Sequence, residues 1–226
     1  MKGSQSRAVE PVGLRIIGGM LRGRRLQYGG DQRVRPMKDR VRESVFHLLE
    51  AIVADRANGE PDESHDDGRL AGYVAVDLFS GTGALGLEAI SRGAGSALFI
   101  ERHLPTMKFI AENARELDVA ERCEIVFGDA FLESLWRGKL PIDLAWCVFC
   151  CPPYEFFHIR RAELLGLIRS LQTIAPTGSL LVVESDDTFD LSLLPDADRW
   201  TIRRYPPAVV AVITVETNAG WSESEG

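Results

Sequence analysis

The fold is decided by the stretch Val74-Ala-Val-Asp-Leu-Phe-Ser-Gly-Thr-Gly-Ala-Leu-Gly-Leu-Glu-Ala89. An apolar run that ends in Asp77 is followed by three glycines and then by helix-forming residues, a pattern that predicts a strand, a tight turn and a helix. Glycines let backbone N–H groups come close to a ligand, and the following helix directs its positive end to the same place. A nucleotide-containing cofactor is therefore expected at this turn.

Further strands and helices follow the glycine turn in regular alternation. Strands are expected at 96–101, 123–127, 142–151 and 179–184, and helices at 84–92, 105–117 and 162–173. This rhythm predicts a parallel α/β sheet with right-handed crossovers. Two more strands, 200–205 and 208–216, are separated only by Pro206-Pro207, which predicts a terminal antiparallel hairpin.

The length and composition of the chain fit a domain with one hydrophobic core and a small additional segment. The chain has 226 residues, a mass of 25.0 kDa and 45% hydrophobic residues. It contains no run of about 20 apolar residues and no apolar signal core near Met1, so a cytoplasmic protein without a membrane partner is expected. Three of the four cysteines fall in one predicted strand, where side chains alternate between faces, so neither a metal site nor a disulfide framework is expected.

The charge is divided unevenly along the chain. Residues 1–46 hold eleven Lys or Arg and four acidic residues, a net charge of +7, whereas the whole chain carries −7 and the remainder −14. Residues 14–26 predict a short basic hairpin, and a helix follows with Val41, Val45, Leu48, Leu49 and Ile52 on one face. This asymmetry indicates that the basic end meets a polyanion. The candidate contacts are Arg15, Arg22, Arg24, Arg25, Arg35, Lys38 and Arg42.

Acidic side chains stand at three successive strand ends, where open α/β sheets bind ligands. Asp77 could face a cationic amino group of the cofactor or could cap the amides of its own turn. Glu101 could bind ribose hydroxyls, and Asp129 could accept from an adenine amine. At the next strand end, Cys151-Pro-Pro-Tyr154 offers carbonyls for an exocyclic amine and an aromatic ring for a flipped base.

Four blocks together resemble a known family. They are Arg15-Ile-Ile-Gly-Gly-Met-Leu-Arg-Gly-Arg-Arg-Leu26, Arg35-Pro-Met-Lys-Asp-Arg-Val-Arg-Glu-Ser-Val-Phe46, Asp77-Leu-Phe-Ser-Gly-Thr-Gly-Ala-Leu-Gly-Leu-Glu88 and Pro152-Pro153-Tyr154. They are similar to the bacterial enzymes that methylate the N2 amine of a guanine in 16S, small-subunit rRNA with S-adenosyl-L-methionine. The resemblance implies a class I methyltransferase, Rossmann-like fold with a mainly parallel seven-stranded sheet.

The resemblance also implies roles for individual residues. The cofactor would be bound by Asp77, Phe79, Ser80, Gly81, Thr82, Gly83, Glu101, Arg102, Asp129 and Ala130, and the target base by Cys151, Pro152, Pro153 and Tyr154. The expected organisation is a basic RNA-binding extension (1–53), an acidic flexible loop (54–72), a methyltransferase domain (73–217) and a disordered tail (218–226). The expected partner is small-subunit rRNA or an assembling 30S particle, bound by a monomer without metal.

The sequence departs from the family pattern at three places. Cys151 stands where the family has Asp, and its relatives Asn, and a thiol is a weak acceptor that is mostly neutral at pH 7. Met37 replaces a usual Thr, and the acidic stretch 58–68 is an addition. A weakened or inactive relative that binds cofactor and RNA therefore stays open. A nicotinamide-dependent oxidoreductase fits the glycine spacing but leaves the arginines and Pro-Pro-Tyr unexplained.

Overall fold

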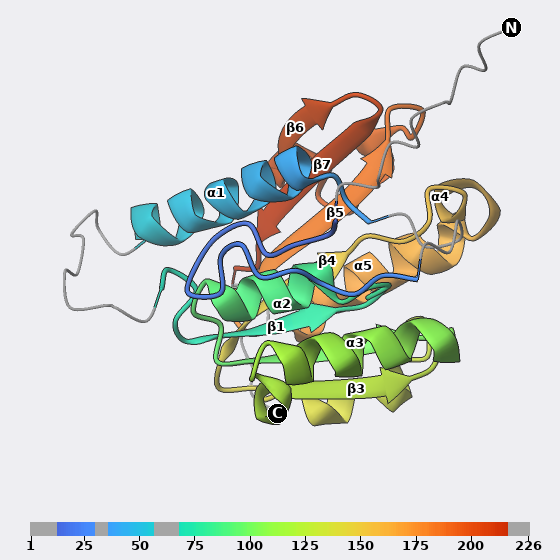
Figure 1. The fold of residues 1–226 in the computed structure, drawn as a ribbon. Helices are drawn as coiled ribbons and strands as arrows, with labels where there is room; N and C mark the ends of the chain where they lie inside the picture. Colours follow the sequence, from blue (N-terminus) through green and yellow to red (C-terminus); the bar gives the residue numbers. More distant parts are fainter. Residues whose placement is uncertain (1–12, 30–35, 57–67, 217–226) are drawn as a thin grey trace, which may run out of the picture.

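The computed structural model describes residues 13–29, 36–56 and 68–216, and its centre is a seven-stranded sheet (Figure 1). The strand order is β3-β2-β1-β4-β5-β7-β6. The strands are β1 (Tyr73–Asp77), β2 (Ser96–Glu101), β3 (Cys123–Phe127), β4 (Ala145–Cys150), β5 (Leu180–Asp186), β6 (Thr201–Tyr205) and β7 (Ala208–Thr214). The first five are parallel, and β7 pairs antiparallel with β5 and β6. The predicted sheet and terminal hairpin are therefore confirmed.

Helices cover both faces of this sheet. They are α1 (Asp39–Arg56), α2 (Ala84–Ser91), α3 (Leu104–Glu116), α4 (Phe156–Ile159) and α5 (Arg161–Ile174). Short 3₁₀ helices occupy Ala120–Arg122, Glu133–Leu135, Arg137–Lys139, Leu191–Leu193 and Ala197–Arg199. None of the helices in the described residues is long and apolar enough to cross a membrane.

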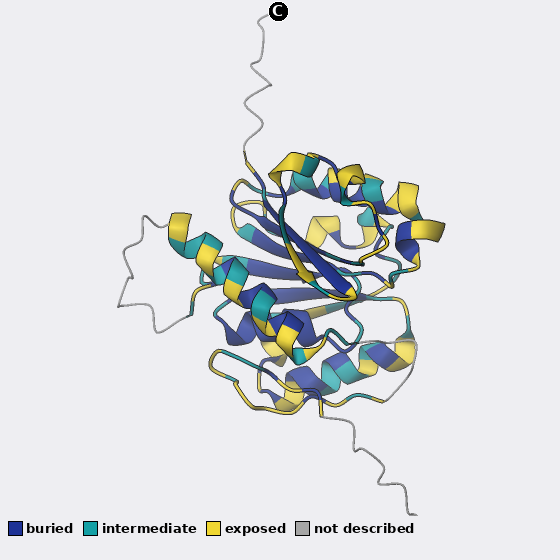
Figure 2. Ribbon diagram, turned by 90° about the horizontal axis from the view of Figure 1, so that it is seen from above, coloured by how far each residue is buried: buried dark blue, intermediate teal, exposed yellow. Residues whose placement is uncertain are grey.

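Two hydrophobic cores arise because side chains alternate along each strand. In β1, Ala75 faces the core formed with α1, α2 and α3, whereas Val74 and Val76 face the core formed with α5. Strands buried on both faces must be apolar throughout, which explains their continuous hydrophobic runs. Figure 2 shows the buried strands between helices whose outer surfaces are exposed.

One strand start differs from the sequence prediction by more than two residues, and one short helix was not expected. The expected strand 142–151 is shorter, because β4 begins at Ala145 and Ile142 is 83% exposed in the preceding loop. The apolar character of Ile142 made the loop look like strand. The short helix α4, which follows Tyr154, was not predicted.

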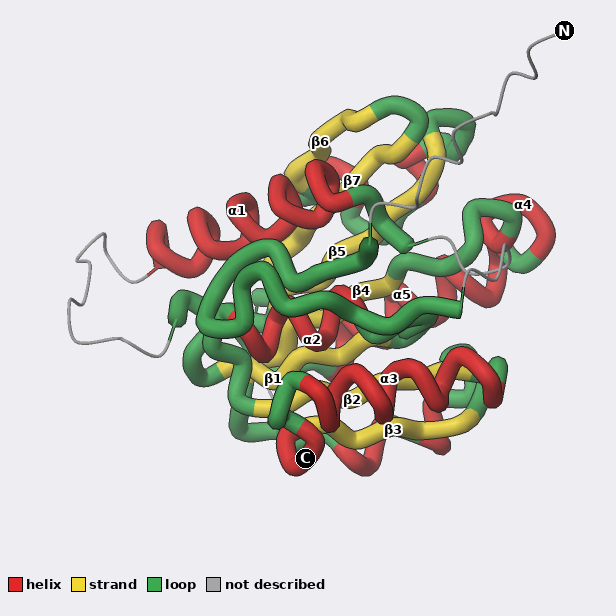
Figure 3. The backbone as a smooth tube through the Cα atoms, in the orientation of Figure 1, coloured by secondary structure: helices red, strands yellow, loops and turns green. Residues whose placement is uncertain are grey.

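The N-terminal segment 13–29 folds back on itself and runs along α2 (Figure 3). Arg15 and Arg25 form an antiparallel bridge, and the Leu26 N–H donates to the Leu14 carbonyl at 2.8 Å. The predicted basic hairpin is thus confirmed, as a single bridge rather than two strands. Its turn needs Gly19, which has φ +73° and leaves room for the Ser91 carbonyl where a Cβ would stand 1.8 Å away.

The described part of the N-terminal extension packs into the same hydrophobic core as the sheet. Leu14, Ile16 and Val45 are buried in the same core as Ala75 of the sheet. The expected boundary at 53 falls within α1, which continues to Arg56, and the described end of the expected loop is anchored by the fully buried Leu70. Residues 57–67 and 217–226, which include most of the expected loop and the whole expected tail, lie outside the described residues.

Candidate active site

The predicted cofactor turn lies at the carboxyl end of β1 and is tied to two strands. The Ser80 hydroxyl donates to the carbonyls of Asp77 at 2.6 Å and Ile100 at 3.0 Å. Helix α2 then begins after Gly83, whose φ of 77° places it in the left-handed region. The turn is therefore held rigidly between β1 and β2, with the amino end of α2 beside it.

Asp77 is a buried acceptor for the beginning of helix α2. The residue is 1% exposed, and its Oδ2 accepts the Gly86 N–H at 3.2 Å. Burial raises the pKa of Asp77 to about 7, with Glu101 adding to the rise. Of the two roles that the sequence left open, the geometry favours positioning of the turn over direct contact with a cofactor amino group.

Glu101 links the glycine turn to the end of β2 by hydrogen bonds. Its two carboxylate oxygens accept the N–H groups of Gly81 and His103, each at 2.8 Å. A carboxylate offers about four acceptor positions, so Glu101 can still bind hydroxyl groups of a ribose. Glu101 lies at the end of β2 beside the glycine turn, and its contact with a ribose stays a prediction.

Asp129 is already engaged in an ion pair. Its Oδ2 lies 3.0 Å from Arg160 Nη1, and the Arg160 guanidinium stacks 3.9 Å from the centre of the Phe131 ring. Phe79 and Phe156 complete an aromatic group with Phe131, with ring centres 5.6 to 6.2 Å apart. Contact between Asp129 and an adenine amine, which stays a prediction, would have to share the carboxylate with Arg160.

The remaining predicted cofactor residues divide by exposure. Phe79, Gly81 and Arg102 are accessible, and Arg102 lies 5.1 Å from the centre of the Phe156 ring. The buried members are Ser80, Thr82, Gly83 and Ala130. These buried residues can shape the site, but their side chains are not exposed and so cannot contact a ligand directly.

The predicted target-base residues follow β4 directly. Pro152 is buried and Pro153 is exposed, and the Pro153 carbonyl accepts the Phe156 N–H at 2.9 Å, which starts α4. The expectation that both proline carbonyls are free is therefore wrong for Pro153. Burial raises the pKa of the Cys151 thiol well above its usual range, so this side chain stays neutral.

Glu184 at the end of β5 completes this end of the site. The Tyr154 hydroxyl donates to Glu184 Oε1 at 2.7 Å, and burial raises the pKa of both groups. Glu184 was not among the predicted site residues, although it is the acid that ends the predicted strand 179–184. The same signal that selected Asp77 and Glu101 could have found it.

The predicted RNA contacts are only partly on the surface. Arg15, Arg22, Arg24, Arg25 and Lys38 are exposed, whereas Arg35 lies outside the described residues. Arg42 is 0% exposed, and its Nη2 donates to the Arg15 carbonyl at 2.6 Å. The prediction for Arg42 is wrong, because its guanidinium is enclosed between α1, the hairpin and α2.

Glu88 is the anion that holds this enclosed region. Its carboxylate accepts the N–H groups of Ile17 and Gly18 at 2.7 Å each and Arg92 Nε at 2.9 Å, and Arg42 Nε lies 3.8 Å away. Arg92 continues the network to Glu50 at 2.8 Å. One acid in an otherwise apolar helix was the available signal for this buried network.

Asn113 of α3 joins the hairpin to the cofactor turn. Its Oδ1 accepts the Gln27 N–H at 2.6 Å, and its Nδ2 donates to the carbonyls of Gln27 at 3.1 Å and Thr82 at 3.3 Å. Asn113 is fully buried. The basic segment and the predicted cofactor turn are therefore connected through one side chain.

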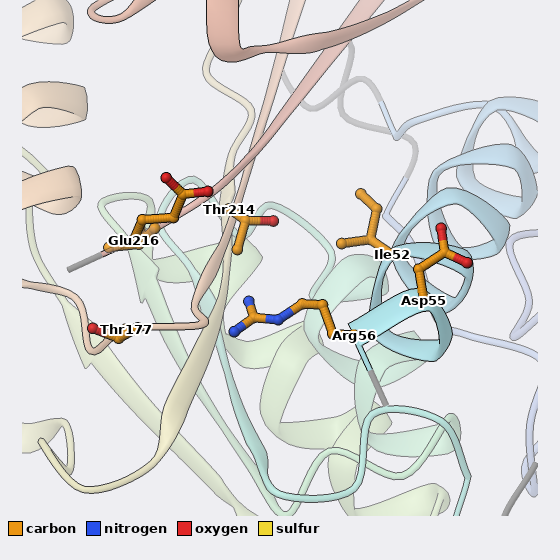
Figure 4. Close-up of a pocket in the computed structure, with 7 residues that line it drawn as sticks. Ile52, Asp55, Arg56, Thr177, Thr214 and Glu216 are labelled. Atoms are coloured by element: carbon orange, nitrogen blue, oxygen red, sulfur yellow. The ribbon is translucent and has the colours of Figure 1, made fainter. Parts of the chain in front are cut away.

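A surface pocket lies at the opposite end of the sheet (Figure 4). Arg56 at the end of α1 reaches toward Thr177 and Thr214, which precede β5 and end β7. Ligands of open α/β sheets bind at the carboxyl ends of the strands, so this pocket is separate from the candidate site. No cluster of three or more His, Cys, Asp or Glu side chains within 13–29, 36–56 and 68–216 is placed to hold a metal ion.

Comparisons with known proteins agree with this geometry. The model of the family described as Conserved hypothetical protein 95 matches residues 14–206. Ribosomal RNA small subunit methyltransferase D of Escherichia coli is 30% identical over 84% of this chain and 83% of its own length, and YlbH of Bacillus subtilis is 28% identical over 79% and 85%. The solved structure of yhhF from Escherichia coli superimposes with a TM-score of 0.65 at 25% identity, covering 91% of this chain and 99% of that one. The chain therefore belongs to the Conserved hypothetical protein 95 family, the family of ribosomal RNA small subunit methyltransferase D, and it has the class I methyltransferase fold.

Proposed function

We propose that this protein transfers a methyl group from S-adenosyl-L-methionine to the N2 amine of a guanine in small-subunit rRNA. The name of the relative from Escherichia coli refers to small-subunit ribosomal RNA. The resemblance of the sequence blocks indicates that the methyl group is added to the N2 amine of a guanine. The observation that carries the proposal is the meeting of the glycine turn, Glu101 and the Cys151–Tyr154 segment at the carboxyl ends of β1, β2 and β4. The turn of the basic hairpin packs against Ser91 at the end of α2, away from this site, and its exposed arginines extend the surface that RNA could cover.

The groups at this edge suit the chemistry of the proposed cofactor. S-adenosylmethionine presents an ammonium, two ribose hydroxyls and an adenine amine, all of which are hydrogen-bond donors. Glu101 and Asp129 are accessible acceptors at successive strand ends, and the half-buried ring of Phe79 contacts Phe131, which follows Asp129 by two residues. When bound, the cofactor supplies an activated methyl group on a sulfonium sulfur.

The protein's contribution to such a reaction is chiefly alignment. Tyr154 offers a ring on which an everted guanine can stack, and its hydroxyl is fixed by Glu184. The exposed arginines of the hairpin bind RNA phosphates and so orient the RNA on the protein. Correct placement of two reactants can supply much of the rate of a displacement reaction.

The experiment is methyl transfer from labelled cofactor to purified 16S rRNA and to 30S particles. We expect label in the RNA, and we expect loss of transfer without loss of cofactor binding when Tyr154 is replaced by alanine. A chain that binds S-adenosylmethionine in calorimetry but labels neither substrate would contradict the proposed reaction. Tight binding of NAD in the same instrument would favour the oxidoreductase alternative.

A second candidate is a binding protein that has lost turnover. It is favoured by Cys151, whose neutral thiol cannot offset the positive charge that develops on an attacking amine. The substitution Cys151→Asp distinguishes the two candidates. It should change an active enzyme only modestly, and it should create activity in a chain that has none.

A further inference from the structure

Glu184 stands beside Cys151 on the same face of the sheet. Cys150 pairs with Val183 in the parallel register of β4 and β5, so the next residues along, Cys151 and Glu184, are neighbours at the two strand ends. The backbone N–H of Glu184 faces the Cys151 sulfur, and the Glu184 carboxylate accepts the Tyr154 hydroxyl at 2.7 Å. Glu184 therefore contacts both side chains that are expected to meet the target base, Tyr154 through its carboxylate and Cys151 through its backbone N–H.

Four other acceptors near this point are engaged or unsuitable. The Cys151 thiol is neutral, and the Pro153 carbonyl accepts from α4. Asp77 is buried beneath the turn, where it caps Gly86. Asp186 accepts both the N–H and the hydroxyl of Thr188, at 3.1 and 2.7 Å, through its Oδ1.

Glu184 has the properties that an acceptor for the target amine needs. It is half-buried, so a base stacked on Tyr154 can reach it, and only Oε1 is used by the tyrosine hydroxyl. Burial raises its pKa, which makes the carboxylate a stronger proton acceptor. Electrostatic groups of this kind act most strongly where water is excluded.

We propose that Glu184 is a catalytic residue that accepts a hydrogen bond from the N2 amine, the contact for which Cys151 has no carboxylate. The proposal rests on the proposed function. The nitrogen lone pair forms the new N–C bond while the bond from sulfur to the methyl carbon breaks and leaves its electron pair on sulfur, which becomes a neutral thioether. The positive charge passes to the nitrogen, which then releases one proton to the Glu184 carboxylate and from there to water.

The first test is Glu184→Gln, which keeps the size of the side chain and an oxygen for Tyr154. We expect kcat for methyl transfer to 30S particles to fall by about 10²–10³, as for the loss of other preorganised electrostatic contacts, with the Kd for S-adenosylmethionine unchanged in calorimetry. Asp186→Asn is the matched control and should change kcat by less than about threefold. A wild-type kcat in Glu184→Gln would overturn the proposal.

A rescue experiment separates a catalytic from a structural role. In the double variant Cys151→Asp with Glu184→Gln, a carboxylate returns at the neighbouring strand end, and we expect kcat to recover at least tenfold relative to Glu184→Gln alone. No recovery would count against the proposed role. Tyr154→Phe keeps the ring and removes only the bond to Glu184, so it should lose less activity than Glu184→Gln; an equal loss would mean that Glu184 acts by holding the tyrosine.

The proposed function and this inference fail differently. A wild-type chain that binds cofactor but labels no small-subunit RNA would overturn both. A wild-type chain that methylates the guanine with Glu184→Gln equally active would overturn only the role of Glu184.

Discussion

Replacing Glu88 with glutamine tests whether one buried carboxylate holds the basic hairpin on the methyltransferase core. The wild-type oxygens receive two backbone N–H groups at 2.7 Å and Arg92 at 2.9 Å, and Glu88 is fully buried. Glutamine keeps one acceptor oxygen, but its NH₂ group then faces a backbone N–H or an arginine. Two buried guanidinium groups also lose the anion that compensates their charge.

The expected cost follows from these losses. An unsatisfied buried donor costs about 1–3 kcal/mol, and removal of one partner from a buried ion pair costs about 3–5 kcal/mol. These effects overlap, so we expect the free energy of unfolding to fall by about 3–5 kcal/mol, a large part of the total stability of a typical domain.

Urea unfolding followed by tryptophan fluorescence measures this change. The matched control is Glu43→Gln on the exposed side of α1, which should change the free energy of unfolding by less than about 0.5 kcal/mol. A loss below about 1 kcal/mol in Glu88→Gln would refute the assignment of Glu88 as the anion that joins the hairpin to α2.

Four further substitutions test other parts of the protein. Because the pKa of Asp77 is raised to about 7 in the native state, the native carboxyl keeps a proton that the unfolded chain has lost above about pH 4. The free energy of unfolding should therefore fall by up to about 1.4 kcal/mol per unit as the pH rises from about 4 to about 7. Asp77→Asn should remove this pH dependence, and curves of unfolding free energy against pH that run parallel for the two proteins would contradict the raised pKa of Asp77. Arg22→Ala should lower the salt slope of RNA affinity by about one without affecting stability, whereas Arg42→Ala should destabilise the fold; the reverse pattern would restore Arg42 as a phosphate contact. Asn113→Ala should weaken cofactor and RNA binding together, each by about three- to tenfold, because it removes the bonds to Gln27 and Thr82; calorimetry that finds only one affinity changed would disprove the link.

The sheet could be predicted because the relevant signal is local. Strands buried on both faces are apolar throughout, and glycine turns and helical periods separate them, so β1, β2 and β3 were located within a residue or two. The same signal misplaced the start of β4, because Ile142 is apolar yet exposed. Residue type indicates preference for the interior but does not report where a loop passes over the surface.

The site was less predictable because its contacts join distant parts of the chain. Arg42 looked like a phosphate contact because a charge run predicts a solvated surface, and its neighbour Glu88 is far away in sequence. The ion pair between Arg160 and Asp129 likewise joins distant parts of the chain, because Asp129 follows β3 whereas Arg160 directly precedes α5. The strand-end pattern could have located Glu184, but its position next to Cys151 follows from the register of β4 with β5.

We propose that the site formed by the glycine turn, Tyr154 and Glu184 methylates a guanine amine. Mass spectrometry of nucleosides digested from 30S particles that have been incubated with the protein and S-adenosylmethionine measures this product directly. We expect N2-methylguanosine at up to one residue per particle, and none when Tyr154→Ala protein is used. Methylation of another atom or another nucleoside, or unmodified RNA in the presence of bound cofactor, would contradict this proposal.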